Sequence, residues 1–145
     1  MRMSAQRRTD WESLIAAAQE ASKRAHAPYS RFRVGAALEG ARGAVYVGCN
    51  VENSSLGLTV CAERAALFRA ISEGEQEFRR LTIYTPDGGP VSPCGACRQV
   101  LAEFSRCLPI LSLGIGGERR EFNLRELLPE AFGWPAGEDG PGLET

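Results

Sequence analysis

The stretch from Leu81 to Leu113 decides the fold, and it runs LTIYTPDGGPVSPCGACRQVLAEFSRCLPILSL. Its first part, Leu81–Thr85, is a short β-branched run that is typical of a strand. The breaker sequence Asp87-Gly88-Gly89-Pro90 ends that strand, and a helix is expected from Cys94 to about Phe104. A second apolar strand follows over Ile110–Leu113. Strand, helix and strand in this order predict a crossover connection and a parallel pair of strands.

The residues before this stretch add a helix, a hairpin and a second helix. We expect the first helix to begin after Thr9, an N-cap residue with Glu12 three positions on, and to end at Pro28. Val34–Leu38 and Ala44–Cys49 are expected to form the two strands of a hairpin. A helix over Cys61–Glu73, ended by a glycine, and a short helix over Leu124–Leu128 are expected as well.

These elements predict an α/β fold, because a parallel strand pair needs helices on the faces of its sheet. We expect a three-layer sandwich, with a mixed sheet of about five strands between helical layers. Residues 1–133 form one domain in this interpretation, in keeping with the length of 145 residues. Residues 134–145, which are rich in proline and glycine, are expected to form a flexible C-terminal tail.

Composition excludes several classes of protein. Hydrophobic residues make up 43% of the chain and charged residues 24%, which is ordinary for a globular protein and argues against disorder. The net charge of −1 argues against a broad basic surface for nucleic acid. The longest apolar run, Leu14–Ala18, is far shorter than the roughly 18 residues of a membrane span. No apolar segment follows the basic residues 1–8, so we expect a cytoplasmic protein.

The five cysteines suggest metal binding. An odd number of cysteines without a signal peptide fits a reducing compartment better than a set of disulfides. Cys94 and Cys97 form a C-x-x-C motif, which by itself is compatible with zinc binding or with thioredoxin-like redox chemistry. Cys49, Cys61 and Cys107 complete the set.

Three of these thiols fall at the starts of two predicted helices. Cys61 begins one helix, and Cys94 and Cys97 lie in the first turn of another. Helix N-termini favour the thiolate form that binds metal. Three thiolates with a fourth, open position are the arrangement of a catalytic zinc site. Glu63 lies two residues after Cys61, where its carboxylate can act as a general acid and base on a water molecule.

A structural zinc site is the alternative interpretation of the same cysteines. Such a site normally has four protein ligands, and Cys49 or Cys107 could supply the fourth. Both are otherwise expected to be small buried residues. His26, the only histidine, is expected at the surface near a helix end, and the pairs Arg79–Arg80 and Arg119–Arg120 on solvated faces.

The motif Cys61-Ala62-Glu63-Arg64 followed by Ser92–Gln99 resembles the short, homotetrameric, zinc-dependent cytidine deaminases. The resemblance extends to three further blocks: Ala27–Ala37, Gly48–Asn53 and Leu127–Phe132. It implies a cytidine deaminase-like fold and hydrolytic deamination of cytidine and 2′-deoxycytidine to uridine and 2′-deoxyuridine plus ammonia, as in pyrimidine salvage. It also implies a homotetramer with active sites shared between subunits, acting on a small-molecule nucleoside.

The resemblance assigns roles to individual residues. Cys61, Cys94 and Cys97 would hold one Zn²⁺ per chain, and Glu63 would shuttle protons while zinc-activated hydroxide attacks C4 of the base. Asn50 and Glu52 would bind the ribose 3′-hydroxyl, and the backbone N–H of Ala62 would contact the pyrimidine carbonyl. Phe32 would pack beside the nucleoside, and Phe132 would come from a neighbouring subunit to stack on the base.

Arg64 has a physical reason to lie next to this site. Three thiolates on Zn²⁺ leave a formal charge of −1, which opposes the acidification of a bound water, and a nearby guanidinium offsets that excess. We therefore predict that Arg64 donates a hydrogen bond to at least one ligand sulfur.

Leu56 departs from the family pattern, which usually has a tyrosine at this position that reaches a neighbouring active site. Leucine cannot donate a hydrogen bond there. This difference leaves a second hypothesis open, a deaminase of a modified cytosine nucleoside such as blasticidin S. A deaminase acting on nucleic acid would need a basic path for the strand, which the sequence lacks. A non-enzymatic zinc-stabilised module would have no open metal position and would not bind a transition-state analogue tightly.

Overall fold

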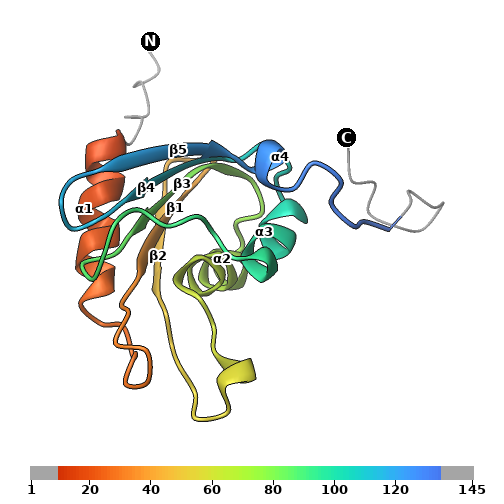
Figure 1. Cartoon of the computed structure of the whole chain (residues 1–145). Coiled ribbons are helices and arrows are strands. Elements are labelled where there is room, and N and C mark those ends of the chain that lie inside the picture. Colours follow the sequence, from red (N-terminus) through yellow and green to blue (C-terminus); the bar gives the residue numbers. More distant parts are fainter. Residues whose placement is uncertain (1–9, 135–145) are drawn as a thin grey trace.

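A five-stranded mixed sheet forms the middle layer of the molecule, with α1 on one face and α2 and α3 on the other (Figure 1). The computed structural model describes residues 10–134. Its helices are α1 (Trp11–Ser22), the 3-10 turn η1 (Leu56–Leu58), α2 (Ala62–Ser72), α3 (Gly95–Ala102) and α4 (Leu124–Leu127). Its strands are β1 (Gly35–Gly40), β2 (Val45–Cys49), β3 (Phe78–Tyr84), β4 (Pro109–Leu113) and β5 (Arg119–Asn123).

The strand order is β2-β1-β3-β4-β5, and only one neighbouring pair is parallel. Strand β1 pairs antiparallel with both β2 and β3, and β4 pairs antiparallel with β5. β3 and β4 are parallel, with Leu81 opposite Ile110, and α3 connects them. The crossover predicted from residues 81–113 is therefore confirmed, as is the mixed sheet between helical layers.

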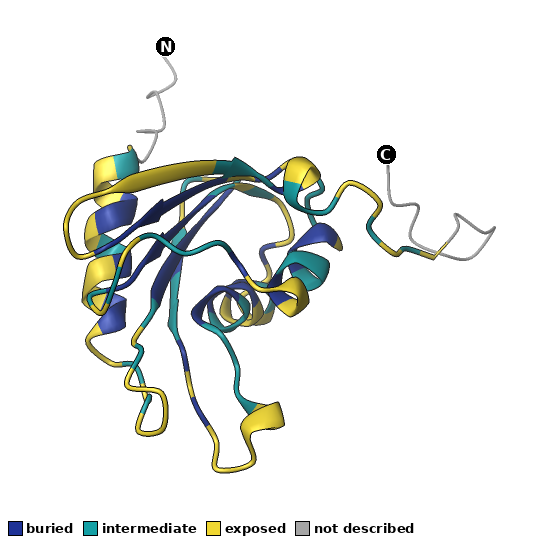
Figure 2. Ribbon diagram, viewed as in Figure 1, coloured by how far each residue is buried: buried dark blue, intermediate teal, exposed yellow. Residues whose placement is uncertain are grey.

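Alternating side chains of the central strands fill two separate cores. Leu38 and Ile83 are fully buried on the side of α2 and α3, whereas Ala37 and Leu111 face α1. The burial colours of Figure 2 show these strands as the buried middle of the molecule. Because the middle of the sheet is covered on both faces, the buried parts of β1, β3 and β4 are largely apolar rather than alternating: residues 36–38, 81–84 and 110–113.

Two expectations about the ends of α1 were wrong. Asp10, not Thr9, is the N-cap: its carboxylate Oδ1 accepts a hydrogen bond from the Ser13 backbone N–H at 2.8 Å. A carboxylate at this position also interacts favourably with the helix dipole. Thr9 lies outside the described residues. The helix ends at Ser22, six residues before Pro28, because the chain turns there to approach β2 through the backbone bond from His26 N–H to Asn50 O.

Strand β5 was not predicted as an element from the sequence. It carries arginines and a glutamate, and its first three residues are exposed. An edge strand with one solvated face does not show the apolar pattern of a buried strand. Arg119 and Arg120 are solvent-exposed on it, as expected for a solvated face.

Gly48 in β2 sets how closely α2 packs on the sheet. A Cβ atom at this position would lie 2.4 Å from Ala66 N and 2.6 Å from Ala62 O, both backbone atoms of α2. Neither atom belongs to a flexible side chain that could move aside. The N-terminal turn of α2 therefore lies against β2 in direct backbone contact.

We expect Gly48→Ala to destabilise the protein by about 1–3 kcal/mol or more, because α2 must shift away from β2. Urea unfolding of both proteins measures this difference. Gly57→Ala is the matched control, since nothing lies within 4 Å of a Cβ at that position. Equal unfolding midpoints for Gly48→Ala and the parent would contradict the close approach described here.

Candidate active site

The three predicted thiols meet at the N-terminal ends of α2 and α3. Cys61 is the N-cap of α2, Cys94 is the N-cap of α3, and Cys97 lies in the first turn of α3. The Sγ atoms of the three residues all lie within 4.8 Å of one another, and Cys61 and Cys94 are 3.7 Å apart. Neither N-cap thiol is used to cap its own helix, so both sulfurs are available to a ligand.

This donor set fits zinc. Tetrahedral Zn²⁺ with Zn–S bonds of about 2.3 Å places its sulfur ligands about 3.8 Å from one another, close to the separation of Cys61 and Cys94. Cys49 and Cys107 are not part of the cluster. Within residues 10–134, the protein thus offers this metal three ligands, which favours the open, catalytic arrangement over the structural one.

The environment of the cluster favours one thiolate even without metal. The pKa of Cys61 is lowered to about 5, mainly by a hydrogen bond from Cys97 and also by Arg64. Burial acts in the opposite direction but is outweighed. The pKa of Cys97 is raised because its hydrogen bond to Cys61 holds the proton and because it is buried. Of these two thiols, Cys61 is therefore the one that loses its proton more readily to become a metal ligand.

Arg64 lies where the charge argument placed it. Its Nη2 group donates a hydrogen bond to Cys61 Sγ at 3.5 Å and another to Thr59 O at 3.4 Å. The contact with Cys61 raises the pKa of the guanidinium above its usual value. The predicted hydrogen bond from Arg64 to one of the clustered sulfurs is confirmed.

Glu63 is a buried carboxyl beside the thiols. Only 4% of its surface is exposed, and its Oε2 accepts a hydrogen bond from Cys97 Sγ at 3.9 Å. Burial raises the pKa of this carboxyl to about 7. A carboxyl with a pKa near neutrality can both take up and release a proton at physiological pH, which a general acid and base requires.

A cavity of about 300 Å³ opens directly over these groups. Most of the predicted site residues line it: Phe32, Asn50, Glu52, Cys61, Ala62, Glu63 and Cys94. The sequence interpretation missed five other lining residues, all within or beside the motif blocks: Ser30, Val34, Thr59, Val91 and Ser92. A cavity of this size, with few polar groups at defined positions, suits a small organic molecule.

Asn50 and Glu52 organise the loop that forms one wall of the cavity. The Asn50 side chain accepts from Val34 N–H at 2.8 Å and donates to Phe32 O at 2.7 Å. Glu52 accepts hydrogen bonds from the backbone of Tyr29 and Ser30 and from the Ser30 hydroxyl. The Ser30 hydroxyl and these backbone donors hold the pKa of Glu52 below its ordinary value. Each side chain can still form hydrogen bonds with a ligand. The Asn50 amide, for example, has one N–H and one oxygen lone pair left.

Phe132 and Leu56 do not join this cavity within the single chain. Phe132 is 71% exposed, its carbonyl accepts a hydrogen bond from Gln99 Nε2 of α3, and its ring packs edge-on against Trp134. Leu56 is 67% exposed on η1. Trp134 is the only residue of the expected tail that lies within the described part of the chain.

The residues named in the rival interpretations fall outside the cluster. Cys107 is exposed, as is His26, which confirms the surface position expected for the histidine. Cys49 is partly buried, and burial raises the pKa of its thiol. The expectation that both Cys49 and Cys107 are buried is therefore wrong for Cys107, which lies in the loop before β4 with Arg125 Nε donating to its sulfur at 3.2 Å.

Comparison with known proteins identifies the family. Residues 8–108 match the family model described as the cytidine and deoxycytidylate deaminase zinc-binding region. A cytidine deaminase of Sporosarcina psychrophila is 48% identical over 124 residues, which cover 85% of this chain and 91% of that protein. The chain belongs to the cytidine deaminase family. The matched region contains all three clustered thiols, and together they support a zinc ion as cofactor.

Solved structures of the family share the fold closely. The crystal structure of cytidine deaminase from Burkholderia pseudomallei superimposes with a TM-score of 0.82 and 45% sequence identity, covering 86% of this chain and all of that one. Cytidine deaminase from Mycobacterium tuberculosis gives a TM-score of 0.76 at 42% identity over 87% of this chain and 99% of that one. The three-layer sandwich with its mixed sheet is therefore the fold of this family.

We expect Cys94→Ala to lower the zinc content of the purified protein well below one ion per chain, because two thiols hold the ion less tightly than three. Metal analysis by mass spectrometry measures this content. Cys107→Ala removes an exposed thiol outside the cluster and serves as the control. Unchanged zinc in Cys94→Ala would contradict the assignment of this ligand.

Proposed function

We propose that the protein catalyses the hydrolytic deamination of cytidine and 2′-deoxycytidine. Water adds to C4 of the base and ammonia leaves, so the products are uridine or 2′-deoxyuridine and ammonia. The observation that carries this proposal is the buried Glu63 carboxyl beside three converging thiols on the floor of a cavity. Membership of the cytidine deaminase family supports the same reaction.

The metal site in this proposal consists of Cys61, Cys94 and Cys97. Bound zinc supplies the acidity that makes a water molecule nucleophilic near neutral pH. Arg64 places a positive charge next to the Cys61 sulfur, and the N-terminal ends of α2 and α3 add the partial positive charges of their helix dipoles. These charges offset the excess negative charge of three thiolates.

Glu63 moves the protons of the reaction. Its carboxylate accepts a proton from the attacking water and delivers it to N3 of the base. It then takes the second proton from the hydroxyl now bonded to C4 and gives it to the amino group, so that ammonia leaves and the C4 carbonyl forms. Burial supports this role, because the pKa of about 7 leaves both protonation states accessible. No other carboxyl among the residues that line the cavity is beside the thiols; Glu52 is engaged by the loop at Tyr29 and Ser30.

The remaining lining residues hold the nucleoside. The backbone N–H of Ala62 donates to the pyrimidine carbonyl in this proposal, which its place in the first turn of α2 and in the cavity lining supports. Asn50 and Glu52 bind the ribose 3′-hydroxyl with the hydrogen-bonding capacity that the loop leaves free. Phe32 provides an apolar wall beside the nucleoside.

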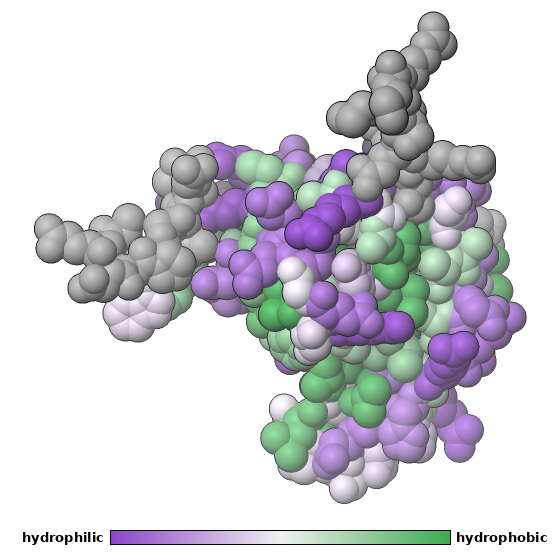
Figure 3. Space-filling view, turned by 180° about the vertical axis from the view of Figure 1, so that it is seen from behind, coloured by the Kyte–Doolittle hydropathy of each residue, from purple (hydrophilic) through white to green (hydrophobic). Residues whose placement is uncertain are grey.

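A homotetramer completes the site in this proposal, with Phe132 of each chain stacking on the base in a neighbouring one. Phe132 and Trp134 are large apolar side chains with 71% and 79% of their surface exposed. Leu56 and Leu58 are exposed as well, and Figure 3 shows hydrophobic surface that reaches into the lower lobe of the molecule. Exposed apolar groups of this size are typical of a protein interface.

The biological setting that we propose is pyrimidine salvage in the cytoplasm. A reducing compartment keeps the three thiols of the metal site free of disulfides. Within residues 10–134, no helix has both the length and the apolar character needed to cross a membrane.

We expect Glu63→Gln to reduce kcat for cytidine by about 10²–10⁴-fold while zinc remains bound, because the amide cannot transfer protons. The fall in ultraviolet absorbance as cytidine is converted measures the rate, and metal analysis confirms the zinc. Glu73→Gln, at the exposed C-terminal end of α2, should keep full activity. Near-normal turnover by Glu63→Gln would refute the proposed mechanism.

We expect Phe132→Ala to raise KM for cytidine about tenfold, as the loss of one aromatic ring stacked on a base predicts. Phe132→Tyr retains the ring and should restore most of the affinity. Steady-state kinetics measures both variants, and sedimentation velocity gives their assembly state. A fully active monomer at low protein concentration would disprove the shared site.

A further inference from the structure

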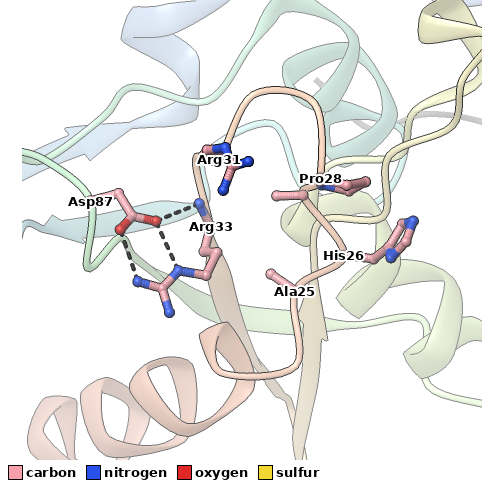
Figure 4. Close-up of a pocket in the computed structure, with 7 residues that line it drawn as sticks. Ala25, His26, Pro28, Arg31, Arg33 and Asp87 are labelled. Atoms are coloured by element: carbon pink, nitrogen blue, oxygen red, sulfur yellow. Dashed lines mark hydrogen bonds and ion pairs between the residues drawn. The ribbon is translucent and has the colours of Figure 1, made fainter.

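A second cavity, of about 530 Å³, lies beside the loop that connects α1 to β1. Figure 4 shows the side chains around it, contributed by that loop and by the segment after β3. Its lining residues are Ala25, His26, Ala27, Pro28, Arg31, Arg33 and Asp87. None of them lines the cavity over the three thiols, so the two cavities are separate sites on the two sides of one loop.

Alternate residues of this loop face the two cavities. Phe32 and Val34 line the cavity over the thiols, whereas Arg31 and Arg33 line the second one. The Asn50 side chain fixes this segment, because it accepts a hydrogen bond from Val34 N–H and donates one to Phe32 O. Arg31, just before it, has a φ of 56°, in the left-handed region, so the chain turns sharply there. Both guanidinium groups thus line the second cavity, on the segment whose Phe32 and Val34 line the first.

Arg33 is oriented by a carboxylate. Asp87 Oδ1 accepts from Arg33 Nη2 at 2.9 Å, and Oδ2 accepts from Arg33 Nε at 3.0 Å and from its backbone N–H at 2.9 Å (Figure 4). This paired contact uses one edge of the guanidinium and leaves the Nη1 group without a hydrogen bond to another described residue. Asp87 thus holds Arg33 in place and balances its charge.

Arg31 supplies the charge that is left over. Its side chain is exposed and makes no hydrogen bond or ion pair with any residue in the range 10–134, while its backbone N–H donates to Ala27 O at 3.0 Å. With Arg33 balanced by Asp87, the lining carries an excess charge of +1 from Arg31. The imidazole of His26 adds a further hydrogen-bonding group.

We propose that this cavity binds a small organic phosphate, with its phosphate group on Arg31 and Arg33 and its organic part against Ala25, Ala27 and Pro28. Guanidinium groups bind phosphate through paired, charge-assisted hydrogen bonds. The volume of the cavity is in the range that accommodates a small organic ligand rather than an inorganic anion alone. The apolar side chains opposite the arginines give that organic part a surface to contact.

Calorimetric titration of the full-length, zinc-bound protein with adenosine 5′-phosphate tests this proposal. Saturating uridine in the cell keeps the cavity over the thiols occupied, so heat reports the second cavity alone. Separate titrations with adenosine and with inorganic phosphate distinguish the contributions of the organic part and of the anion. This readout does not depend on deamination, and a loss of binding in Arg31→Gln assigns the heat to the second cavity whether or not uridine fills the first, so the test remains informative even if the proposed function fails.

The proposal predicts that adenosine 5′-phosphate binds, that inorganic phosphate binds more weakly, and that adenosine does not bind detectably. Arg31→Gln should weaken the affinity for adenosine 5′-phosphate by at least about tenfold, because it removes a charge-assisted contact. Arg31→Lys keeps the charge but not the paired geometry, and should fall between Arg31→Gln and the parent. Arg69→Gln, which removes an exposed positive charge from α2, should bind like the parent.

Three results would overturn the proposal. They are no binding of adenosine 5′-phosphate by the parent at millimolar concentration, equal binding of adenosine and its phosphate, and undiminished binding by Arg31→Gln. Circular dichroism of Arg31→Gln shows whether it is folded, and its exposed position favours this. If Arg31→Gln fails to fold, the salt dependence of the parent carries the test, and an affinity for adenosine 5′-phosphate that is the same in low and high salt would refute a charge-dependent site.

Discussion

The convergence of two helix N-termini on one point is the constraint on which the active site depends. Three sulfur atoms within 4.8 Å of one another require α2 and α3 to begin side by side on the same face of the sheet. The close backbone contact of α2 with Gly48 sets the position of one helix. The parallel pairing of β3 and β4 sets the other, because α3 is the connection between them.

The same packing changes the acidity of Glu63. A glutamate in the first turn of a solvated helix would titrate well below neutral pH. Here the floor of the cavity buries the carboxyl and raises its pKa to about 7. Arg64, the next residue, points to Cys61 and balances the charge of the thiols. Glu63 and Arg64 are adjacent in one turn but differ in their electrostatics: burial favours the neutral form of Glu63, whereas Arg64 stays charged and pairs with a sulfur.

Much of the site could be predicted because its chemistry is local in sequence. The C-x-x-C motif and the Cys61–Arg64 motif place thiols and carboxyl at helix starts by spacing alone, and the parallel pair follows from the order strand, helix, strand. Strand β5 was missed because an edge strand with exposed arginines lacks an apolar pattern. The N-cap of α1 was misplaced by one residue because Thr9 and Asp10 are both good caps, and only the hydrogen bond to Ser13 distinguishes them.

By itself, the sequence predicted which groups form the candidate site: three thiols, one glutamate and one arginine, in motifs that indicate helix starts. Only the tertiary structure decided that Asn50 and Glu52 support the loop at residues 29–34, and that Arg31 and Arg33 face a second cavity instead of the first. The physical reason is distance along the chain. Residues a few positions apart are oriented by local backbone geometry, whereas contacts between the residues just after β2 and a loop some twenty residues earlier exist only once the sheet has formed.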